Sequence, residues 1–261
     1  MTRLDQALVD RGLCESRERA QRAILAGQVR VNAQRAHKPS DSVQPDDALA
    51  LEAGEKYVSR GGYKLEHALR HFRLDVAGLV AIDIGASTGG FTDCLLQHGV
   101  ATVFAVDVGQ GQLAWKLRQD RRVVVMEKTN ARFLTPEKFS GRADLQVGST
   151  IPGSSGFGGF DLATIDCSFI SLRKILPAAI ALLKAKGKII ALIKPQFEAG
   201  KAEADKGRGV INDPTVHERV LSELREFVAA QAGLDWHGVV ESTLLGPAGN
   251  KEFLVLIEKT S

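Results

Sequence analysis

A buried strand, a loop of small residues and the start of a helix follow one another in Val80-Ala81-Ile82-Asp83-Ile84-Gly85-Ala86-Ser87-Thr88-Gly89-Gly90-Phe91. The apolar run before Gly85 is typical of a strand in a parallel sheet, and the glycines after it allow the backbone to approach a ligand closely. Open parallel sheets bind their ligands at the carboxyl ends of such strands. The stretch therefore predicts a cofactor loop, although a tight strand-to-helix turn without a ligand would also favour small residues.

The spacing of the glycines distinguishes two classes of nucleotide cofactor. A dinucleotide loop has the pattern G-x-G-x-x-G, whereas Gly85, Gly89 and Gly90 form G-x-x-x-G-G, and Asp83 stands two positions before the first of them. S-adenosylmethionine therefore fits this loop better than NAD. Asp107 ends the next predicted strand, where a carboxylate meets ribose hydroxyls, but such a residue is expected with either cofactor.

Strand-like and helix-like segments alternate through this region, which predicts a doubly wound α/β domain. We expect strands at 80–84, 102–106, 123–126, 162–165, 188–193 and 253–258, and helices at 90–98, 113–118, 172–183 and 214–231. The segment 146–160 is rich in Gly and Ser and predicts a flexible surface loop.

Polar residues flank three of the other predicted strands, where a core would not accept them. Asp166 and Lys194 each follow an apolar run, and Glu252 precedes the last one. We expect all three at one rim of the sheet, although each is also compatible with a plain solvated strand end. Burial of a lysine favours its neutral form and an adjacent carboxylate opposes this; a neutral Lys194 can act as general base on a substrate alcohol.

Composition indicates a globular protein and excludes several classes. The 261 residues, 44% of them hydrophobic and 25% charged, are enough for one large domain and one small one. Cys14, Cys94 and Cys167 form no C-x-x-C pair, so we expect neither a disulfide framework nor a thiolate zinc site, and a reducing, cytoplasmic location. His67 and His71 lack a third ligand, so no metal site is predicted. No signal core or membrane-length apolar run is present.

The amino-terminal forty residues carry most of the basic bias. The formal net charge is +3 for the whole chain, whereas eight Arg and Lys oppose four Asp and Glu in this segment. Leu4, Ala7 and Leu8 predict one short helix, and the segment 17–26 predicts a second helix capped by Ser16, with strands from 28 onward. The basic side chains either form a solvated surface or bind a polyanion.

Three segments of this region resemble the S4 RNA-binding domain, namely Arg3-Leu4-Asp5-Gln6-Ala7-Leu8, Ser16-Arg17-Glu18-Arg19-Ala20 and Gly27-Gln28-Val29-Arg30-Val31-Asn32. Ala33 departs from the glycine that members of that family often have after Val-Asn. The resemblance implies that basic side chains contact RNA phosphates and position the RNA without reading its sequence. These residues are Arg3, Arg17, Arg19, Arg22 and Lys38.

The motifs taken together resemble the TlyA family from end to end. They are Ser59-Arg60-Gly61-Gly62-Tyr63-Lys64, the glycine loop 83–91, Asp166-Cys167-Ser168-Phe169-Ile170-Ser171-Leu172 and Lys194-Pro195-Gln196-Phe197-Glu198. In that family an S4 domain precedes a methyltransferase domain of the FtsJ type. The resemblance implies an S4 domain at 1–55, a linker at 56–63, and at 64–261 a Rossmann-like class I methyltransferase domain with a mostly parallel seven-stranded sheet.

The resemblance also implies an activity, which is S-adenosylmethionine-dependent 2′-O-methylation of ribosomal RNA, in known relatives at cytidine. The catalytic tetrad would be Lys64, Asp166, Lys194 and Glu252, with Lys194 deprotonating the 2′-hydroxyl and the other three orienting the reacting groups. The cofactor would contact Asp83, Gly85, Ala86, Ser87, Thr88, Gly89, Gly90, Phe91, Asp107 and Asn130. The partners would be ribosomal RNA or ribosomal subunits.

Two other classes of function remain as alternatives. The family's historical name, hemolysin, suggests a membrane-damaging protein, but the sequence has no insertion element that a pore-former would need. A non-catalytic RNA-binding or ribosome-assembly factor is the second alternative. The intact glycine loop and tetrad argue against it.

Overall fold

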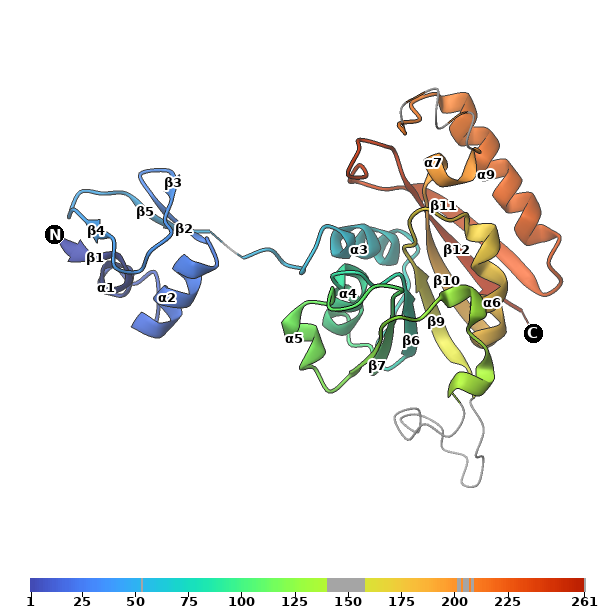
Figure 1. Ribbon diagram of the computed structural model, residues 1–261, viewed down its shortest axis with the longest axis horizontal. Helices are drawn as coiled ribbons and strands as arrows, with labels where there is room; N and C mark the ends of the chain where they lie inside the picture. Colours follow the sequence, from blue (N-terminus) through green and yellow to red (C-terminus); the bar gives the residue numbers. More distant parts are fainter. Residues whose placement is uncertain (53, 140–157, 201–202, 204–206, 208, 261) are drawn as a thin grey trace, which may run out of the picture. The chain divides into compact units, whose positions relative to one another are not determined.

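The computed structural model of the protein divides into two compact units, Met1–Lys56 and Tyr57–Ser261 (Figure 1). It describes residues 1–52, 54–139, 158–200, 203, 207, 209 and 210–260. The predicted linker 56–63 falls, apart from Lys56, in the second unit, where Tyr57 is buried. The predicted loop 146–160 lies outside the described residues except for its last three positions.

The first unit packs two short helices against small β-strands. Its elements are β1 (Thr2–Arg3), α1 (Leu4–Asp10), α2 (Arg17–Leu25), β2 (Val29–Val31), β3 (Gln34–Arg35), β4 (Ser42–Val43) and β5 (Leu49–Leu51). Ser16 caps α2 by accepting from the Arg19 backbone N–H, and Leu8, Ile24 and Val29 share one core. Asn32 and Ala33 both have left-handed φ angles, 49° and 66°, in the two-residue turn between β2 and β3, a position that favours glycine over Ala33.

The second unit contains a seven-stranded, mostly parallel sheet within the described residues. The strand order is β11-β12-β10-β9-β6-β7-β8, with β12 antiparallel to both of its neighbours. This confirms the predicted fold class. The strands are β6 (Val80–Ile84), β7 (Thr102–Val106), β8 (Val123–Met126), β9 (Phe160–Ile165), β10 (Leu183–Ile193), β11 (Leu234–Glu241) and β12 (Phe253–Lys259).

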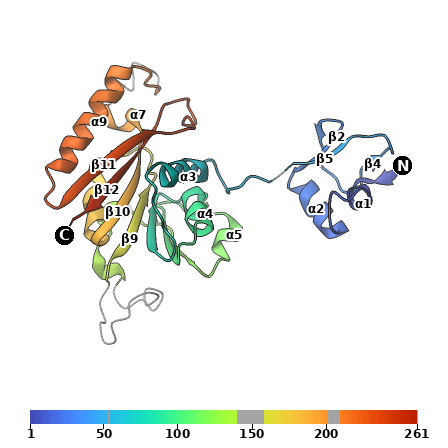
Figure 2. The same ribbon diagram turned by 180° about the vertical axis from the view of Figure 1, so that it is seen from behind.

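Helices cover both faces of this sheet. They are α3 (Gly61–His71), α4 (Gly90–Gln97), α5 (Trp115–Arg118), α6 (Leu176–Leu182), α7 (Pro195–Glu198) and α9 (Pro214–Ala229), with short 3₁₀ turns η1 (Ala131–Phe133), η2 (Pro136–Phe139) and η4 (Leu172–Lys174). Side chains alternate along β6, so Ala81 packs with α3 and α4, whereas Ile82 and Ile84 pack with α6 and α9. Figures 1 and 2, which view the molecule from opposite sides, both show α9 beside β11.

Two elements differ from the sequence prediction. The expected single helix 172–183 is divided into η4 and α6, because Pro177 near the start of α6 cannot donate a backbone hydrogen bond inside a continuous helix. Strand β11 was not predicted, because Gly238 and a register shift between Trp236 and Gly238 interrupt its pattern. Among the described residues, no helix combines the length and the apolar character needed to cross a membrane.

Candidate active site

Two cavities open at the carboxyl ends of the parallel strands. One, about 750 Å³, is lined by Lys64 and Lys194 and is called the lysine cavity. The other, about 790 Å³, is lined by Asp107 and Asn130 and is called the Asp107 cavity. They adjoin, because both are lined by Gly85, Ser87, Asp166, Ser168, Phe169 and Phe197. Each has the size of a small-molecule site.

Four charged side chains meet as two ion pairs in the lysine cavity. Lys194 Nζ lies 2.5 Å from Asp166 Oδ1 and also donates to Ser168 Oγ at 2.9 Å. Lys64 pairs with Glu252, and these two side chains are almost completely buried. Both lysines and both carboxylates line the cavity, so each lysine there faces a carboxylate partner. Buried charges are tolerated when they are paired in this way.

The sheet topology explains why these four residues converge. Asp166 follows β9 and Lys194 follows β10, so both lie at the carboxyl edge of the parallel strands. Strand β12 is antiparallel to β10, with Phe253 opposite Ile193, so β12 begins at that same edge and brings Glu252 there. Lys64 reaches the edge from α3, which packs against α4.

Two glycines of the loop 83–91 let other backbone segments pack directly against it. Gly85 has φ +85°, and a Cβ atom there would lie 2.6 Å from the Asp166 carbonyl oxygen. A Cβ on Gly90 would lie 2.9 Å from the Gly62 nitrogen, so this glycine allows α4 to begin against α3. Part of the glycine pattern is therefore required by packing around the cavity. Ala86, Thr88 and Phe91, like Gly85, Ser87 and Gly90, line the lysine cavity.

Asp83 lies beneath this loop and lines neither cavity. Its carboxylate is fully buried and accepts from Thr92 Oγ1 at 2.6 Å and Thr164 Oγ1 at 2.9 Å. Burial raises the pKa of Asp83 to about 6, against the opposing effect of the two threonine hydrogen bonds. Gly89, which was also predicted to contact the cofactor, faces Leu113 and Leu117 and likewise lines neither cavity. Through these two hydrogen bonds Asp83 joins β6 to α4 and to β9 inside the protein.

Asp107 and Asn130 meet in the Asp107 cavity, as their positions after neighbouring strands would predict. Asp107 accepts from the backbone N–H of Gly109 at 2.7 Å and of Ser87 at 2.8 Å. Asn130 caps η1 by accepting from the Arg132 backbone N–H at 3.1 Å. The Asp107 carbonyl accepts from the Thr129 N–H, which holds the two predicted cofactor residues close together.

Several residues of the site were not assigned a role from the sequence, although they lie inside the quoted motifs. Ser168 accepts a hydrogen bond from Lys194. Phe169 is 90% exposed, has a left-handed φ of 64°, and its ring centroid lies 5.1 Å from that of Phe197. Glu198 binds the loop that carries Asp166. Their contacts depend on the spacing of two separate loops, which the sequence does not specify.

The predicted RNA-binding residues lie in the first unit, and two of them share a buried carboxylate. Asp5 is fully buried and accepts from Arg3 Nε and Nη2 and from Arg17 Nε, all at 3.0 Å. These bonds, led by that from Arg3, hold the pKa of Asp5 well below its usual range. The side chains of Arg3 and Arg17 remain about half exposed. Arg19, Arg22 and Lys38 are exposed.

Each of the two units matches a known protein family. The FtsJ-like methyltransferase family matches residues 57–259, and the S4 domain family matches residues 2–49. The 16S/23S rRNA (cytidine-2′-O)-methyltransferase TlyA of Mycobacterium tuberculosis is 46% identical over 258 residues, covering 97% of this chain and 88% of the relative. A Bacillus subtilis protein, provisionally named rRNA methyltransferase YqxC, is 48% identical over 254 residues, 97% of this chain and 84% of the relative.

A solved structure is also similar over the whole chain. It is provisionally named a hemolysin, comes from Streptococcus thermophilus, and is 44% identical with a TM-score of 0.70, covering 100% of this chain and 89% of that chain. The fold and the site thus define an FtsJ-like methyltransferase preceded by an S4 domain. Within that class the chain belongs to the TlyA family.

Proposed function

We propose that the protein transfers a methyl group from S-adenosylmethionine to the 2′-hydroxyl of a cytidine in ribosomal RNA. The observation that carries this proposal is the pairing of Lys194 with Asp166 and of Lys64 with Glu252 in the lysine cavity, which adjoins the Asp107 cavity. The substrate class is taken from the M. tuberculosis relative, which is named for cytidine 2′-O-methylation of 16S and 23S ribosomal RNA.

The residues of the Asp107 cavity fit S-adenosylmethionine. Asp107 provides carboxylate oxygens for two ribose hydroxyls, and Asn130 provides an amide for the adenine edge. Val108, Ala131 and Ile175 add apolar surface beside them for the flat face of the base. The Gly85 loop joins this cavity to the lysine cavity, where the methionine portion would lie. When bound, S-adenosylmethionine supplies an electrophilic methyl group on its sulfonium.

Lys194 is the general base of the proposed reaction. Its Nζ atom lies among Asp166, Ser168 and the open space of the lysine cavity, so it can reach a ribose hydroxyl inserted there. In this role the neutral amine of Lys194 accepts the proton of the 2′-hydroxyl. Asp166 and Ser168 hold the amine in one orientation, and thereby fix the direction from which it approaches the ribose hydroxyl.

Lys64 and Glu252 orient the substrate rather than remove the proton. Their mutual ion pair is buried, so neither side chain is free to rotate toward solvent. The ammonium of Lys64 carries three donors, and those not used by Glu252 can hold a ribose oxygen. The first unit would bring the RNA to this cavity through phosphate contacts of Arg3, Arg17, Arg19, Arg22 and Lys38. We place this activity in the cytoplasm, where ribosomal subunits are assembled.

A methyl-transfer assay tests the proposal. Purified protein is incubated with radiolabelled S-adenosylmethionine and ribosomal subunits that lack the modification, beside the variants Lys194→Ala and Lys251→Ala. Lys251 is a matched control, because it pairs with Glu241 on the surface and lies next to Glu252. We expect label in RNA that makes one ribose resistant to alkaline cleavage, lost in Lys194→Ala and kept in Lys251→Ala. Equal labelling by Lys194→Ala and wild type would refute the role of Lys194.

A further inference from the structure

The ion pair of Lys194 and Asp166 depends on two separate loops. The first loop, Asp166 to Ser171, connects β9 to η4. The second, Lys194 to Glu198, follows β10 and consists of Lys194 and the short helix α7. An ion pair and one hydrogen bond to Ser168 join the loops at the cavity. A second tie, farther along both loops, would hold Lys194 and Asp166 at one separation more firmly than these contacts alone.

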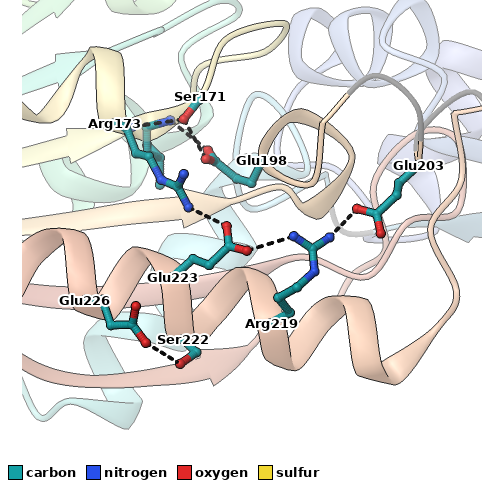
Figure 3. Close-up of polar contacts among 9 residues, drawn as sticks. Ser171, Arg173, Glu198, Glu203, Arg219, Ser222, Glu223 and Glu226 are labelled. Atoms are coloured by element: carbon teal, nitrogen blue, oxygen red, sulfur yellow. Dashed lines mark hydrogen bonds and ion pairs between the residues drawn. The ribbon is translucent and has the colours of Figure 1, made fainter.

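Glu198 supplies this second tie (Figure 3). Its Oε2 atom accepts from Ser171 Oγ at 2.7 Å, and its Oε1 atom accepts from the Leu172 backbone N–H at 2.7 Å. Ser171 in turn accepts from the Arg173 N–H at 3.2 Å, so Glu198 and Ser171 together cap the start of η4. Both carboxylate oxygens of Glu198 are thus used by the loop that carries Asp166.

Helix α7 makes the connection between Lys194 and Glu198 rigid. Pro195 fixes one backbone angle directly after Lys194. The Phe197 N–H donates to the Lys194 carbonyl, and the Ala199 N–H donates to the Pro195 carbonyl, both at 2.9 Å. The two loops are therefore linked by Lys194 with Asp166 at the cavity, by the rings of Phe169 and Phe197, and by Glu198 with Ser171.

We propose that Glu198 is a positioning residue that fixes the separation of Lys194 and Asp166 by clamping their two loops together. This inference rests on the proposed function. Glu198 touches neither cavity, so it acts through the loops and not on the substrate. Burial raises the pKa of the Glu198 carboxyl, against the hydrogen bonds of Ser171 and Leu172 and the charge of Arg173. The clamp consists of the two hydrogen bonds that Glu198 accepts from Ser171 Oγ and the Leu172 N–H.

The ion pairs around the clamp are more exposed and give weaker support. Arg173 pairs with Glu223 of α9, and Glu223 pairs with Arg219, both at 2.8 Å (Figure 3). Arg219 also contacts Glu203. Each of these side chains is 35% to 42% exposed, and such surface pairs stabilise a protein little. The same figure shows the Glu226 carboxylate accepting from Ser222 within α9, away from both loops.

Three variants separate positioning from support of the fold. Glu198→Ala removes both hydrogen bonds, whereas Glu198→Gln keeps them, because the amide oxygen accepts from Leu172 and the amide nitrogen donates to Ser171. Glu226→Ala is the matched control. If Glu198→Ala does not fold, Glu198→Asp replaces it, since its carboxylate is withdrawn by one methylene. For each variant we would measure kcat, KM for ribosomal subunits, Kd for S-adenosylmethionine, and amide hydrogen exchange of the peptide 166–175.

The expected result is a loss of kcat in Glu198→Ala on the order of 10- to 100-fold, larger than the change in KM or in Kd, because the alignment of the reacting groups is lost. Exchange in 166–175 should become faster in that variant, and Glu198→Gln and Glu226→Ala should match wild type in both measurements. A residue that only supported the fold would lower Tm without changing kcat per folded molecule. Unchanged kcat, unchanged exchange, or failure of Glu198→Gln to recover either would overturn the proposal.

Hydrogen exchange also separates this inference from the proposed function. If the wild type transfers no methyl group to either subunit, the proposed function fails, and the clamp is then judged from exchange alone. Faster exchange of 166–175 in Glu198→Ala but not in Glu198→Gln supports the clamp in that case. Equal exchange in the two variants overturns it.

Discussion

Removing Lys64 alone should destabilise the second unit more than removing Lys64 together with Glu252. The two side chains form a buried ion pair and are 6% and 1% exposed, so Lys64→Met leaves the Glu252 carboxylate buried without its cation. Breaking such a pair costs about 3–5 kcal/mol, and water from the adjoining cavity should hold the loss near the lower value. In Lys64→Met/Glu252→Met no unpaired charge remains, and we expect stability within about 1 kcal/mol of wild type.

Urea unfolding followed by circular dichroism and thermal unfolding measure this difference. For a unit of this size a loss of about 3 kcal/mol lowers Tm by roughly 6–12 °C. Lys251→Met is the control, because its ion pair with Glu241 is about half exposed and should contribute less than about 1 kcal/mol. Both the single and the double variant should lose methyl transfer. A single variant within about 1 kcal/mol of wild type, or a double variant less stable than the single one, would refute the reasoning.

Further predictions concern other buried or basic groups. Burial raises the pKa of Asp83 to about 6, so its contribution to stability is present at low pH and is lost as pH rises through about 4 to 6. In urea titrations, Asp83→Asn should therefore gain about 2 kcal/mol relative to wild type between pH 4.5 and pH 8. The pKa of Asp5 is lowered, so the stability that Asp5 contributes is present above about pH 4 and is lost on acidification. Asp5→Asn should therefore make the stability of the first unit depend less on pH below about 4. Asp5→Asn should also weaken RNA binding while leaving kcat at saturating RNA unchanged, since Arg3 and Arg17 lose their shared anchor. Arg19→Ala should reduce the slope of log Kd against log salt by about one, measured by filter binding, with kcat unchanged.

The sequence predicted the parts of the fold that have strong local signals. The apolar run 80–84 followed by glycines identified β6 and its loop, and alternation of similar runs identified the parallel strands. Asp166 and Lys194 were placed together because each follows a parallel strand, and such strands end at one edge. Glu252 was placed with them because it precedes the last apolar run. Lys64 was joined to them by the resemblance to the TlyA family, since no spacing rule relates an early helix to this edge of the sheet.

The remaining features depend on contacts between distant segments. Strand β11 is held by its pairing with β12, and its own sequence, with Gly238 and the charged Asp235 and Glu241, gives a weak strand pattern. Asp83 resembles a ligand-binding residue in the sequence, but Thr92 and Thr164 use its carboxylate inside the protein. The clamp formed by Glu198 likewise requires that two loops lie at one distance, which depends on the packed sheet.

Analysis of the modified nucleoside tests the central claim most directly. Ribosomal RNA treated with protein and S-adenosylmethionine is digested to nucleosides and examined by mass spectrometry, with Lys194→Ala and Lys251→Ala in parallel. The account predicts 2′-O-methylcytidine with wild type and Lys251→Ala and none with Lys194→Ala. A nucleoside methylated on its base, or 2′-O-methylcytidine formed equally by Lys194→Ala, would contradict it.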